Sequence, residues 1–470
     1  MAPDPTPVSR RPLARRSLQL AGRGLATDYA RRLLESLGSR VTVAPGPDDV
    51  GPAVAWARSG LMALTGLADG RPQMCPVPLA SCADGTIAAL RSLAATGGPP
   101  ALPDGAGLLG ERAAIAGLTR NGRISPGGGC RLLQVADGDL AVSLTREDDW
   151  AAVPAWLEEA AVESWEAVAK AVATRSAISL LERGRLLGLA VAGSAPPEVT
   201  TKPWYTVTSE GPPAAPEPQA RPARVVDLSS LWAGPLCAHL LQSIGAQTLK
   251  IESVGRTDGA RNGPPEFYDL LNFGKRSVAL DFNQEGVARL QQLIDWADIV
   301  IEAARPRGLR QLGVIAEDCV ARRRGLTWVS ITGYGRDEPE CNWTAFGDDA
   351  GVAAGLSALM QQVCGLPLIC GDAIADPLTG MHAALAALAS HQGGGGRLLS
   401  LALHDVVSHC IGFSRPTGAV ALRERWAAWT AEARAGGLDA TRPTARTAPG
   451  HARALGADTD TALDGWEDAC

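Results

Sequence analysis

Short apolar runs alternate with longer stretches of helical periodicity between residues 223 and 413. The runs VVDL, TLKIE, SVALD, DIVIEA and TWVSITG are rich in β-branched residues, as buried strands are. The stretch PLCAHLLQSIG, which follows the first run, instead repeats its apolar positions every three or four residues, as an amphipathic helix does. Strands and helices in alternation predict a parallel, doubly wound (Rossmann-like) α/β sheet. We therefore predict one full α/β domain over residues 223–413.

A different pattern occupies residues 121–195. The stretch 122–144, GRISPGGGCRLLQVADGDLAVSL, alternates like a β-hairpin with its turn near Asp137-Gly138. Two helical patterns follow over 146–159 and 164–188, and Gly188 is a suitable stop signal. These patterns predict a small α+β domain.

Residues 21–120 resemble parts of the later domain. Leu33-Leu34 and Gly38 match Leu240-Leu241 and Gly245 at an offset of 207 residues, whereas GTIAAL (85–90) matches GMHAAL (380–385) at an offset of 295. The first copy would thus lack 88 residues that the second has, so we predict a shortened large-domain repeat over 21–120. Chance similarity between two alanine-rich helices is the alternative.

Three flanking segments complete the predicted organisation. Residues 1–20 are rich in Pro and Arg and suggest a flexible basic arm, and residues 196–222 form a Pro-rich linker. Residues 414–470 suggest one C-terminal helix followed by a disordered tail from residue 436. The domain order is therefore shortened large domain, small domain, linker, full large domain.

Composition narrows the class of protein. The 470 residues are 46% hydrophobic with a net charge of −6, which gives no electrostatic case for nucleic-acid binding. The ten cysteines include no CxxC pair, so we expect reduced thiols of a cytoplasmic protein and no metal site. No apolar run approaches the roughly 20 residues needed to cross a bilayer, and the N-terminus lacks the apolar core of a secretory signal.

The stretch IADPLTGMHAALAALASH (374–391) carries the leading candidate for chemistry. Asp376 precedes Pro377 and a small-residue apolar run, which predicts a helix with Asp376 as its N-cap and Pro377 at the first helical position. The positive end of the helix dipole would favour the ionised carboxylate. By itself, this pattern is typical of an ordinary capping residue.

Five segments from Arg224 to Phe413 resemble the class III CoA-transferases, the family of formyl-CoA and carnitine CoA-transferases. In chain order the segments are RVVDLSSLWAGPLCAHLLQSIGAQTLKIE (224–252), LNFGKRSVALDFNQEG (271–286), ADIVIEAARPRGLRQLGV (297–314), GLTWVSITGYG (325–335) and IADPLTGMHAAL (374–385). The order of strand, turn and helix in 122–195 is similar to the small domain of that family. The resemblance implies a fused, rearranged repeat of the family's fold.

The resemblance also implies an activity. Asp376 matches the family's nucleophile, which would transfer CoA from an acyl-CoA to a carboxylic acid through an aspartyl acyl anhydride and an aspartyl-CoA thioester. Coenzyme A would be substrate and product, with no separate cofactor. The partners would be acyl-CoA and carboxylic acids, with no nucleic acid and no membrane. The family's threaded subunits imply a homodimer, intertwined or not. One register also places Ser81 opposite Asp376, so the shortened copy would lack a nucleophile of its own.

Binding residues are carried over in the same way. Leu231, Trp232 and Ala233 would line the thioester end, where Trp232 is either a wall that selects the acyl group or a core residue. Leu280 would pack near the adenine. Arg305 and Arg310 would hold phosphates, with solvated surface positions as the alternative. The glycine loop that closes over the intermediate would be Gly127, Gly128 and Gly129.

The sequence departs from the family pattern at three places. Ala303-Ala304 replaces the Asn-Phe of the ENFRPG segment, and Ser253 stands where a basic residue usually follows KIE, with Arg256 as a substitute. The surroundings of Gly127–Gly129 also differ. The first two departures bear on CoA affinity and the third on transfer to a free acid.

Two other functions are consistent with the sequence. Acyl-CoA racemases share the fold but use a His/Asp pair, and here TAFGDDAG (344–351) has Phe346 and no His. Asp348 or Asp349 could supply a base, although residues of a turn are the simpler interpretation. The third function is a non-catalytic acyl-CoA-binding homologue.

Overall fold

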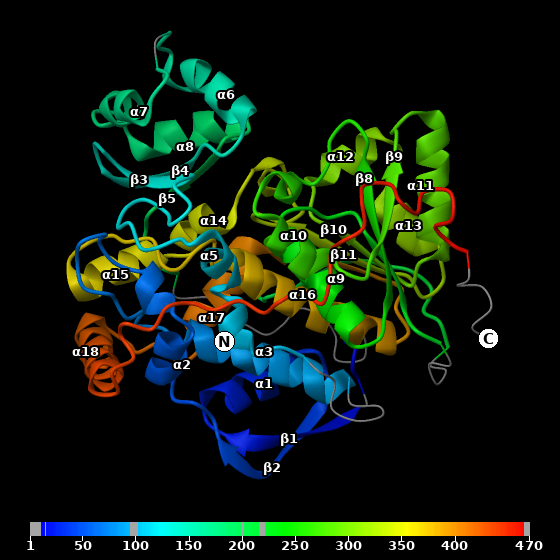
Figure 1. The fold of residues 1–470 in the computed structure, drawn as a ribbon, viewed down its shortest axis with the longest axis horizontal. Helices are drawn as coiled ribbons and strands as arrows, with labels where there is room; N and C mark the ends of the chain where they lie inside the picture. Colours follow the sequence, from blue (N-terminus) through cyan, green and yellow to red (C-terminus); the bar gives the residue numbers. More distant parts are fainter. Residues whose placement is uncertain are drawn as a thin grey trace.

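A seven-stranded sheet forms the centre of the larger part of the molecule (Figure 1). The computed structural model describes residues 11–14, 16–94, 102–160, 162–198, 202–215 and 221–464. The strand order is β6-β12-β11-β10-β7-β8-β9, and every pairing is parallel except that of β6 with β12. The predicted α/β class is confirmed. The strands are β6 (Thr206–Glu210), β7 (Arg224–Asp227), β8 (Gln247–Ser253), β9 (Arg276–Leu280), β10 (Ile299–Glu302), β11 (Thr327–Thr332) and β12 (Arg397–Ala402).

Consecutive residues of the central strands pack on opposite faces of this sheet. Val225 and Val329 belong to a cluster with helices α9 (Ala233–Ser243), α16 (Ala375–Gln392) and α17 (Leu403–Gly412). Val226 and Trp328 belong to a second cluster with α11 (Gln284–Trp296) and α13 (Ala316–Arg322). The period of two is that of a strand buried on both sides, which explains why the runs read as continuously apolar.

The connections around the carboxyl ends of the strands are short helices. They are α10 (Pro265–Asn272), α12 (Pro306–Gln311), α14 (Gly347–Ala353) and α15 (Leu356–Cys364), with single 3₁₀ turns at Gly259–Asn262 and Glu340–Asn342. In an open α/β sheet, ligands bind outside these carboxyl ends. The elements that could hold a substrate therefore lie in this region.

The small domain projects from the rest of the molecule (Figure 1). Strands β3 (Cys130–Val135), β4 (Gly138–Ser143) and β5 (Ala190–Gly193) form an antiparallel sheet, with the hairpin turn at the expected place. Helices α6 (Glu147–Leu157), α7 (Trp165–Val172) and α8 (Ala177–Leu186) cover it and share a separate apolar core with it. The helical pattern predicted over 164–188 is two helices, because the chain turns between Val172 and Ala177.

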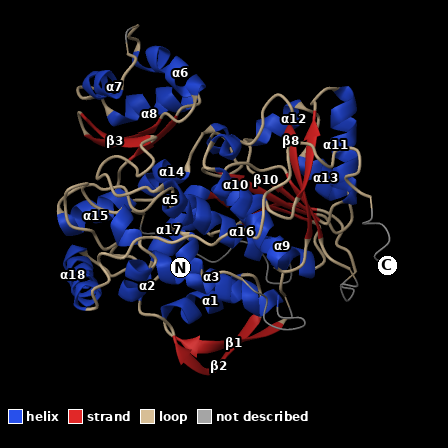
Figure 2. Cartoon of the chain, in the orientation of Figure 1, coloured by secondary structure: helices blue, strands red, loops and turns tan. Residues whose placement is uncertain are grey.

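The first part of the chain has its own two-stranded parallel sheet, separate from the large one (Figure 2). Its elements are β1 (Ser17–Arg23), α1 (Leu25–Ser36), β2 (Arg40–Asp48), α2 (Pro52–Arg58), a 3₁₀ turn (Leu61–Leu64), α3 (Leu79–Ala94), α4 (Gly105–Leu108) and α5 (Glu111–Ala116). Helix α3 packs against both α1 and α16, so this part shares one apolar core with the large domain.

Backbone geometry repeats between the two parts at the two offsets found in the sequence. A Cβ added to Gly85 would lie 2.5 Å from the carbonyl oxygen of Ala26, and one added to Gly380 would lie 2.6 Å from that of Ala233. The α1–α3 and α9–α16 pairs thus approach closely at the same point, where only glycine fits. Gly38 and Gly245 likewise share a left-handed conformation, with φ of 100° and 103°.

Three flanking predictions need correction. Residues 1–10 lie outside the described residues, but Leu13 is buried and β1 begins at Ser17, so the end of the predicted arm is part of the fold. The Pro-rich linker contributes β6, because an edge strand tolerates neighbouring prolines. Residues 199–201 and 216–220 of that linker lie outside the described residues.

The predicted disordered tail is wrong as far as residue 464. After α18 (Ala419–Ala435), the chain crosses the front of the molecule toward β9 (Figure 1). Arg446 forms a two-pronged ion pair with Glu111, and the amide of Ser277 donates to Asp458. The tail is thus held against the body of the protein by contacts to residues distant in the sequence. Within the described ranges, no helix combines the length and apolar character that a bilayer-spanning helix needs.

Candidate active site

Asp376 lies in the first turn of α16 but does not cap it. The helix begins at Ala375 with Ile374 as N-cap, and no side chain caps the helix. The predicted N-cap role is therefore wrong by two positions: the Asp376 amide already donates to the carbonyl oxygen of Ala373, at 2.9 Å. The carboxylate is consequently free to point away from its own helix.

Two other helices supply the donors for this carboxylate. The backbone N–H groups of Ala233, the first residue of α9, and Gly347, the first residue of α14, hydrogen-bond to it. A Cβ on Gly347 would lie 2.3 Å from Oδ2 of Asp376, so no larger residue could stand there without displacing the carboxylate. The amino-terminal ends of three helices thus converge on one partly exposed side chain. Their dipoles favour negative charge at that point.

Burial and charge act in opposite directions on this group. Burial raises the pKa of Asp376 to about 6, while Arg112 and the two backbone donors limit the rise. Burial also raises the pKa of Asp348, and separately that of Asp349, to about 7. A carboxylate with a pKa near 6 is ionised at neutral pH yet more basic than an ordinary aspartate, which suits a nucleophile.

Asp348 and Asp349 are in the first turn of α14 and not in a loop turn. Asp348 accepts a hydrogen bond from the amide of Ala373, which is one residue after Asp372 and three before Asp376. Asp349 accepts one from the hydroxyl of Ser143 in the small domain. The start of α14 therefore joins the small domain to the segment that carries Asp376.

The loop before α9 holds the residues expected at the thioester end. Leu231 is 41% exposed and adopts a left-handed conformation with φ of 69°. Trp232 is buried and packs edge-on against Phe267, with ring centroids 5.4 Å apart. Its ring also lies 5.6 Å from the guanidinium of Arg112. Trp232 thus packs in the core on one side and faces the guanidinium of Arg112 on the other.

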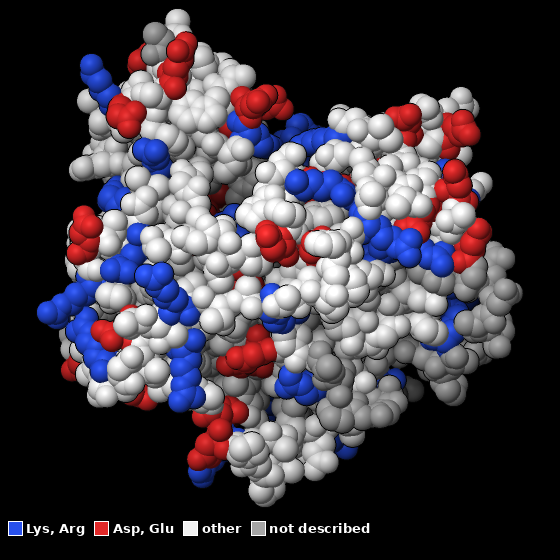
Figure 3. All heavy atoms as spheres, viewed as in Figure 1, with Lys and Arg blue, Asp and Glu red and all other residues white. Residues whose placement is uncertain are grey.

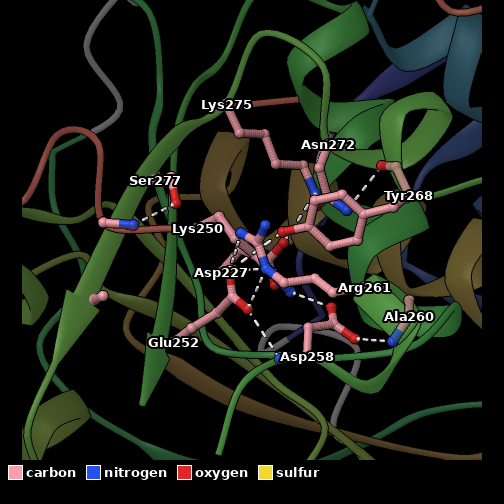
Figure 4. Close-up of polar contacts among 12 residues, drawn as sticks. Asp227, Lys250, Glu252, Asp258, Ala260, Arg261, Tyr268, Asn272, Lys275 and Ser277 are labelled. Atoms are coloured by element: carbon pink, nitrogen blue, oxygen red, sulfur yellow. Dashed lines mark hydrogen bonds and ion pairs between the residues drawn. The ribbon is translucent and has the colours of Figure 1, made fainter. Parts of the chain in front are cut away.

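A network of buried charged residues holds the loop before α9 in place (Figure 4). Lys275 donates to Asp227 at 2.9 Å and to the carbonyl oxygen of Pro235 at 3.0 Å. Lys250 donates to Asp258 and to the carbonyl oxygen of Ser229.

The same network reaches the exposed leucine of the loop. Oδ1 of Asp258 accepts from the amide of Leu231, at 2.9 Å. Both lysines are completely buried. The contacts of the lysines at Ser229 and Pro235, and that of Asp258 at Leu231, position the amide of Ala233 that reaches Asp376.

An arginine-lined cleft of about 750 Å³ separates the small domain from the large one. The space-filling view shows blue side chains gathered at this hollow (Figure 3). The arginines that line it are Arg146, Arg185, Arg256, Arg305 and Arg307.

Arg305 lies at the crowded part of this cleft. Burial, with Arg307, Arg146 and Arg256, lowers the pKa of Arg305. The lining also includes Asp148, Asp149 and Glu182, but the five arginines outnumber these carboxyl groups. The net positive charge is what a phosphate group requires. The cleft also has apolar lining, because Leu186 and Leu187 of the small domain contribute to it.

The cleft and Asp376 are connected through one aromatic residue. The guanidinium of Arg146 lies 5.5 Å from the ring centroid of Phe346, whose neighbour Gly347 donates to Asp376. A ligand that spans from the arginines to Asp376 would therefore pass along the start of α14.

The remaining predicted residues are more scattered. Leu280 ends β9, is buried, and belongs to the core beneath the sheet. Arg310 is exposed, pairs with Glu317 at 2.9 Å, and is not among the residues that line the cleft. Gly127 lies near the site, because a Cβ added to it would be 3.7 Å from Nη2 of Arg112. Gly128 has φ of 78°, and a Cβ on Gly129 would lie 2.7 Å from Cγ2 of Thr145.

Sequence reasoning missed three contributors. Arg112 comes from the shortened repeat, and Arg146 and Arg185 from the small domain. No local pattern predicts a role for any of them, and nothing in the linear sequence brings them to residues more than a hundred positions away. The sequence predicts a turn at Asp348 and Asp349, although the acidic pair after Gly347 also suits the first turn of a helix.

Comparisons with known proteins show what the large domain is similar to. Residues 222–431 match the family model described as CoA-transferase family III. A succinate–glutarate CoA-transferase of Agrobacterium fabrum is 30% identical over 203 residues, which cover 39% of this chain and 51% of that protein. A succinyl-CoA–D-citramalate CoA-transferase of Chloroflexus aurantiacus is 30% identical over 196 residues, which cover 39% and 49%. The resemblance seen in the sequence is thereby confirmed for this part of the chain.

The match is partial in length. The chain spans about half the length of the curated relatives it matches. Among solved structures, a CaiB/BaiF family protein of Brucella suis is 28% identical and covers 41% of this chain and 55% of its own, with a TM-score of 0.37.

Proposed function

We propose that the protein is an acyl-CoA:carboxylate CoA-transferase, on the premise that residues 222–431 carry a CoA-transferase family III domain. The observation that carries the proposal is the placement of Asp376 beneath the amides of Ala233 and Gly347, with its pKa raised to about 6. Related proteins named as transferring CoA between carboxylic acids support the reaction class.

The reaction would proceed by exchange at Asp376. The carboxylate attacks the thioester carbonyl carbon, which gives an acyl anhydride and releases the CoA thiolate. The thiolate attacks the aspartyl carbonyl carbon, which releases the donor acid and leaves an aspartyl-CoA thioester. The acceptor carboxylate then attacks this thioester to form a second anhydride, from which returning thiolate forms the new acyl-CoA and frees Asp376. No water, oxidant or metal enters the balance.

The chain's own residues would support each step. The two amides that bind the Asp376 carboxylate remain close to its carbonyl oxygen when charge develops there. The arginine cleft would bind the phosphates of CoA, with the pantetheine directed along α14 toward Asp376. Gly127–Gly129 would let the loop before β3 approach the intermediate, because glycine carries no side chain to obstruct it.

The experiment that tests this proposal is an exchange assay. The full chain is incubated with a panel of acyl-CoA donors and carboxylic acids, and new acyl-CoA products are identified by mass spectrometry. Transfer with at least one pair is expected. Binding of acyl-CoA without any exchange would favour the non-catalytic homologue instead.

Substitution of the two predicted phosphate-binding arginines should change KM for the acyl-CoA to different extents. Arg305→Gln is expected to raise KM for the acyl-CoA about tenfold with little change in kcat, because the cleft loses a cation that has no ion pair among the described residues. Arg310→Gln should have a much smaller effect, because Arg310 pairs with Glu317 outside the cleft. Steady-state kinetics at two salt concentrations measure both. Equal effects of the two substitutions would place the phosphates elsewhere.

The rate should also fall in mild acid. Asp376 must be ionised to attack, and its pKa is raised to about 6. Below that pH the protonated fraction grows, so kcat/KM should decrease by about tenfold for each further pH unit. A profile that stays flat to the pKa of an ordinary aspartate would contradict the assignment.

One observation favours a racemase or isomerase as second candidate. Asp348, with a pKa raised to about 7, lies in the same carboxyl cluster as Asp376 and could exchange the proton on the α-carbon of an acyl-CoA. Incubation of a 2-methylacyl-CoA in D₂O separates the two functions. Deuterium at the α-carbon without transfer to an acid would favour this candidate.

Assembly and location are further parts of the proposal. We expect a cytoplasmic homodimer, as the resemblance implies. Sedimentation velocity measures the mass directly, and a species of 48.7 kDa at all concentrations would contradict the dimer.

A further inference from the structure

Arg112 reaches the site from the shortened repeat. It is the second residue of α5, and its Nε donates to Oδ2 of Asp372 at 2.9 Å while Nη2 contacts Oδ1 of the same carboxylate. Asp372 is fully buried, whereas the Arg112 side chain is 33% exposed. The guanidinium is thus oriented by one carboxylate and by the ring of Trp232, and it keeps an accessible edge.

The charges that face this cluster come from several elements. The carboxyl groups are Asp348 and Asp349 of α14, Asp372 of the preceding segment, and Asp376 of α16. Arg146 of the small domain approaches Phe346, but its guanidinium is paired with Asp149. The thiol of Cys130 stays protonated, because burial raises its pKa well above the ordinary value. Arg112 therefore brings a guanidinium to three of these carboxyl groups, Asp372, Asp348 and Asp376.

Helix α5 is held in place by the C-terminal tail. Glu111, the neighbour of Arg112, is buried and pairs with Arg446 through two contacts of 2.6 and 2.8 Å. Arg446 also contacts Nε2 of His239 on α9, at 2.9 Å. The same helix α9 presents Ala233 to Asp376, so the tail ties the position of Arg112 to the position of that donor.

We propose that Arg112 is a positioning residue of the transfer reaction, through which the shortened repeat keeps the Asp376 carboxylate ionised and ready to attack. The inference rests on the proposed function. The shortened repeat thus retains a role in the site of the full repeat, although it places Ser81 where the full repeat has Asp376. Asp372 orients Arg112, but it also adds negative charge beside the nucleophile, so its direct effect on Asp376 is opposite to that of Arg112.

The proposal predicts shifts of opposite sign. Arg112 lowers the pKa of Asp376 against the larger effect of burial, whereas Asp372 raises it in the same direction as burial. Arg112→Gln should therefore move the acid limb of the kcat/KM profile upward by about one pH unit, and Asp372→Asn should move it downward. The acid limb of the double variant should lie between those of the two single variants, and that of Arg112→Lys should stay near that of the wild type. Arg423→Gln, an exposed substitution on α18, is the matched control.

A purely structural role would not produce opposite shifts. If Arg112→Gln and Asp372→Asn moved the acid limb in the same direction, or if Arg112→Gln lost activity with the acid limb unmoved, the proposal would be overturned.

A second measurement separates this inference from the proposed function. A diazo reagent esterifies protonated carboxyl groups, so labelling of the Asp376 peptide as a function of pH reports its ionisation without any transfer. Opposite shifts of the labelling midpoint in a protein that transfers no CoA would uphold the role of Arg112 and defeat the function. Normal transfer with unmoved labelling midpoints would do the reverse.

Discussion

Asp376→Asn is expected to lower the rate of CoA transfer by at least about 10³-fold, because the amide cannot form the anhydride. The fold should survive, since the asparagine oxygen can still accept the hydrogen bonds from Ala233 and Gly347. Acyl-CoA binding should also persist, because the arginine cleft is unchanged. Exchange kinetics, thermal unfolding and acyl-CoA titration check the three expectations.

Two substitutions in the shortened repeat serve as controls. Ser81 stands opposite Asp376 in the repeat, is buried, and its hydroxyl has no hydrogen-bond partner in the described residues. Ser81→Ala should leave transfer intact. Asp84 carries the carboxyl group of that copy that is nearest to Ser81 in the sequence, and it accepts a hydrogen bond from the amide of Ala106 at 2.7 Å. An inactive Asp84→Asn beside an active Asp376→Asn would overturn the assignment of the nucleophile.

Lys275→Met should destabilise the protein by about 3–5 kcal/mol, the cost of leaving a buried charge without its partner. Burial disfavours the ionised form of Asp227, but Lys275 and Lys250 together hold its pKa below the ordinary value. Without Lys275, this carboxylate loses a direct contact of 2.9 Å while it remains completely buried. Urea unfolding measures the loss, and transfer should also weaken because the loop before α9 is released.

Lys170→Met is the matched control for that substitution. Lys170 is exposed at the end of α7, so its loss should change the free energy of unfolding by less than about 0.5 kcal/mol. Adding Asp227→Asn to Lys275→Met should cost less than the sum of the two single changes, because the orphaned charge is then removed. If Lys275→Met were as stable as the control, the network would not support the loop as we describe.

The elements of the large domain could be predicted because their pattern is local. Strands such as β10 and β11 are buried on both faces, so continuous apolar runs identify them without knowledge of their neighbours. The tail could not be predicted in this way. Arg446 and Asp458 look like solvated residues in the sequence, yet each finds a partner more than 150 positions away.

In the site, too, a local motif identified some residues, whereas the roles of others depend on tertiary contacts. Asp376 was recognisable from its motif, but its predicted role as N-cap was wrong, because the donors that satisfy it belong to α9 and α14. Arg305 and Arg310 looked alike in the sequence, and only the tertiary structure separates the arginine of the cleft from the one paired with Glu317. Arg112 carried no sequence signal, since its function depends on packing of the first part of the chain against the last.

The measurement that tests the account most directly is covalent trapping at Asp376. The full chain is mixed with a donor acyl-CoA, quenched in acid, digested, and analysed by mass spectrometry beside Asp376→Asn and Ser81→Ala. We expect an acyl or CoA adduct on the peptide that contains Asp376 in the wild type and in Ser81→Ala, and none in Asp376→Asn. An adduct on another residue, or an equal adduct in Asp376→Asn, would contradict the claim that this carboxylate carries the transfer.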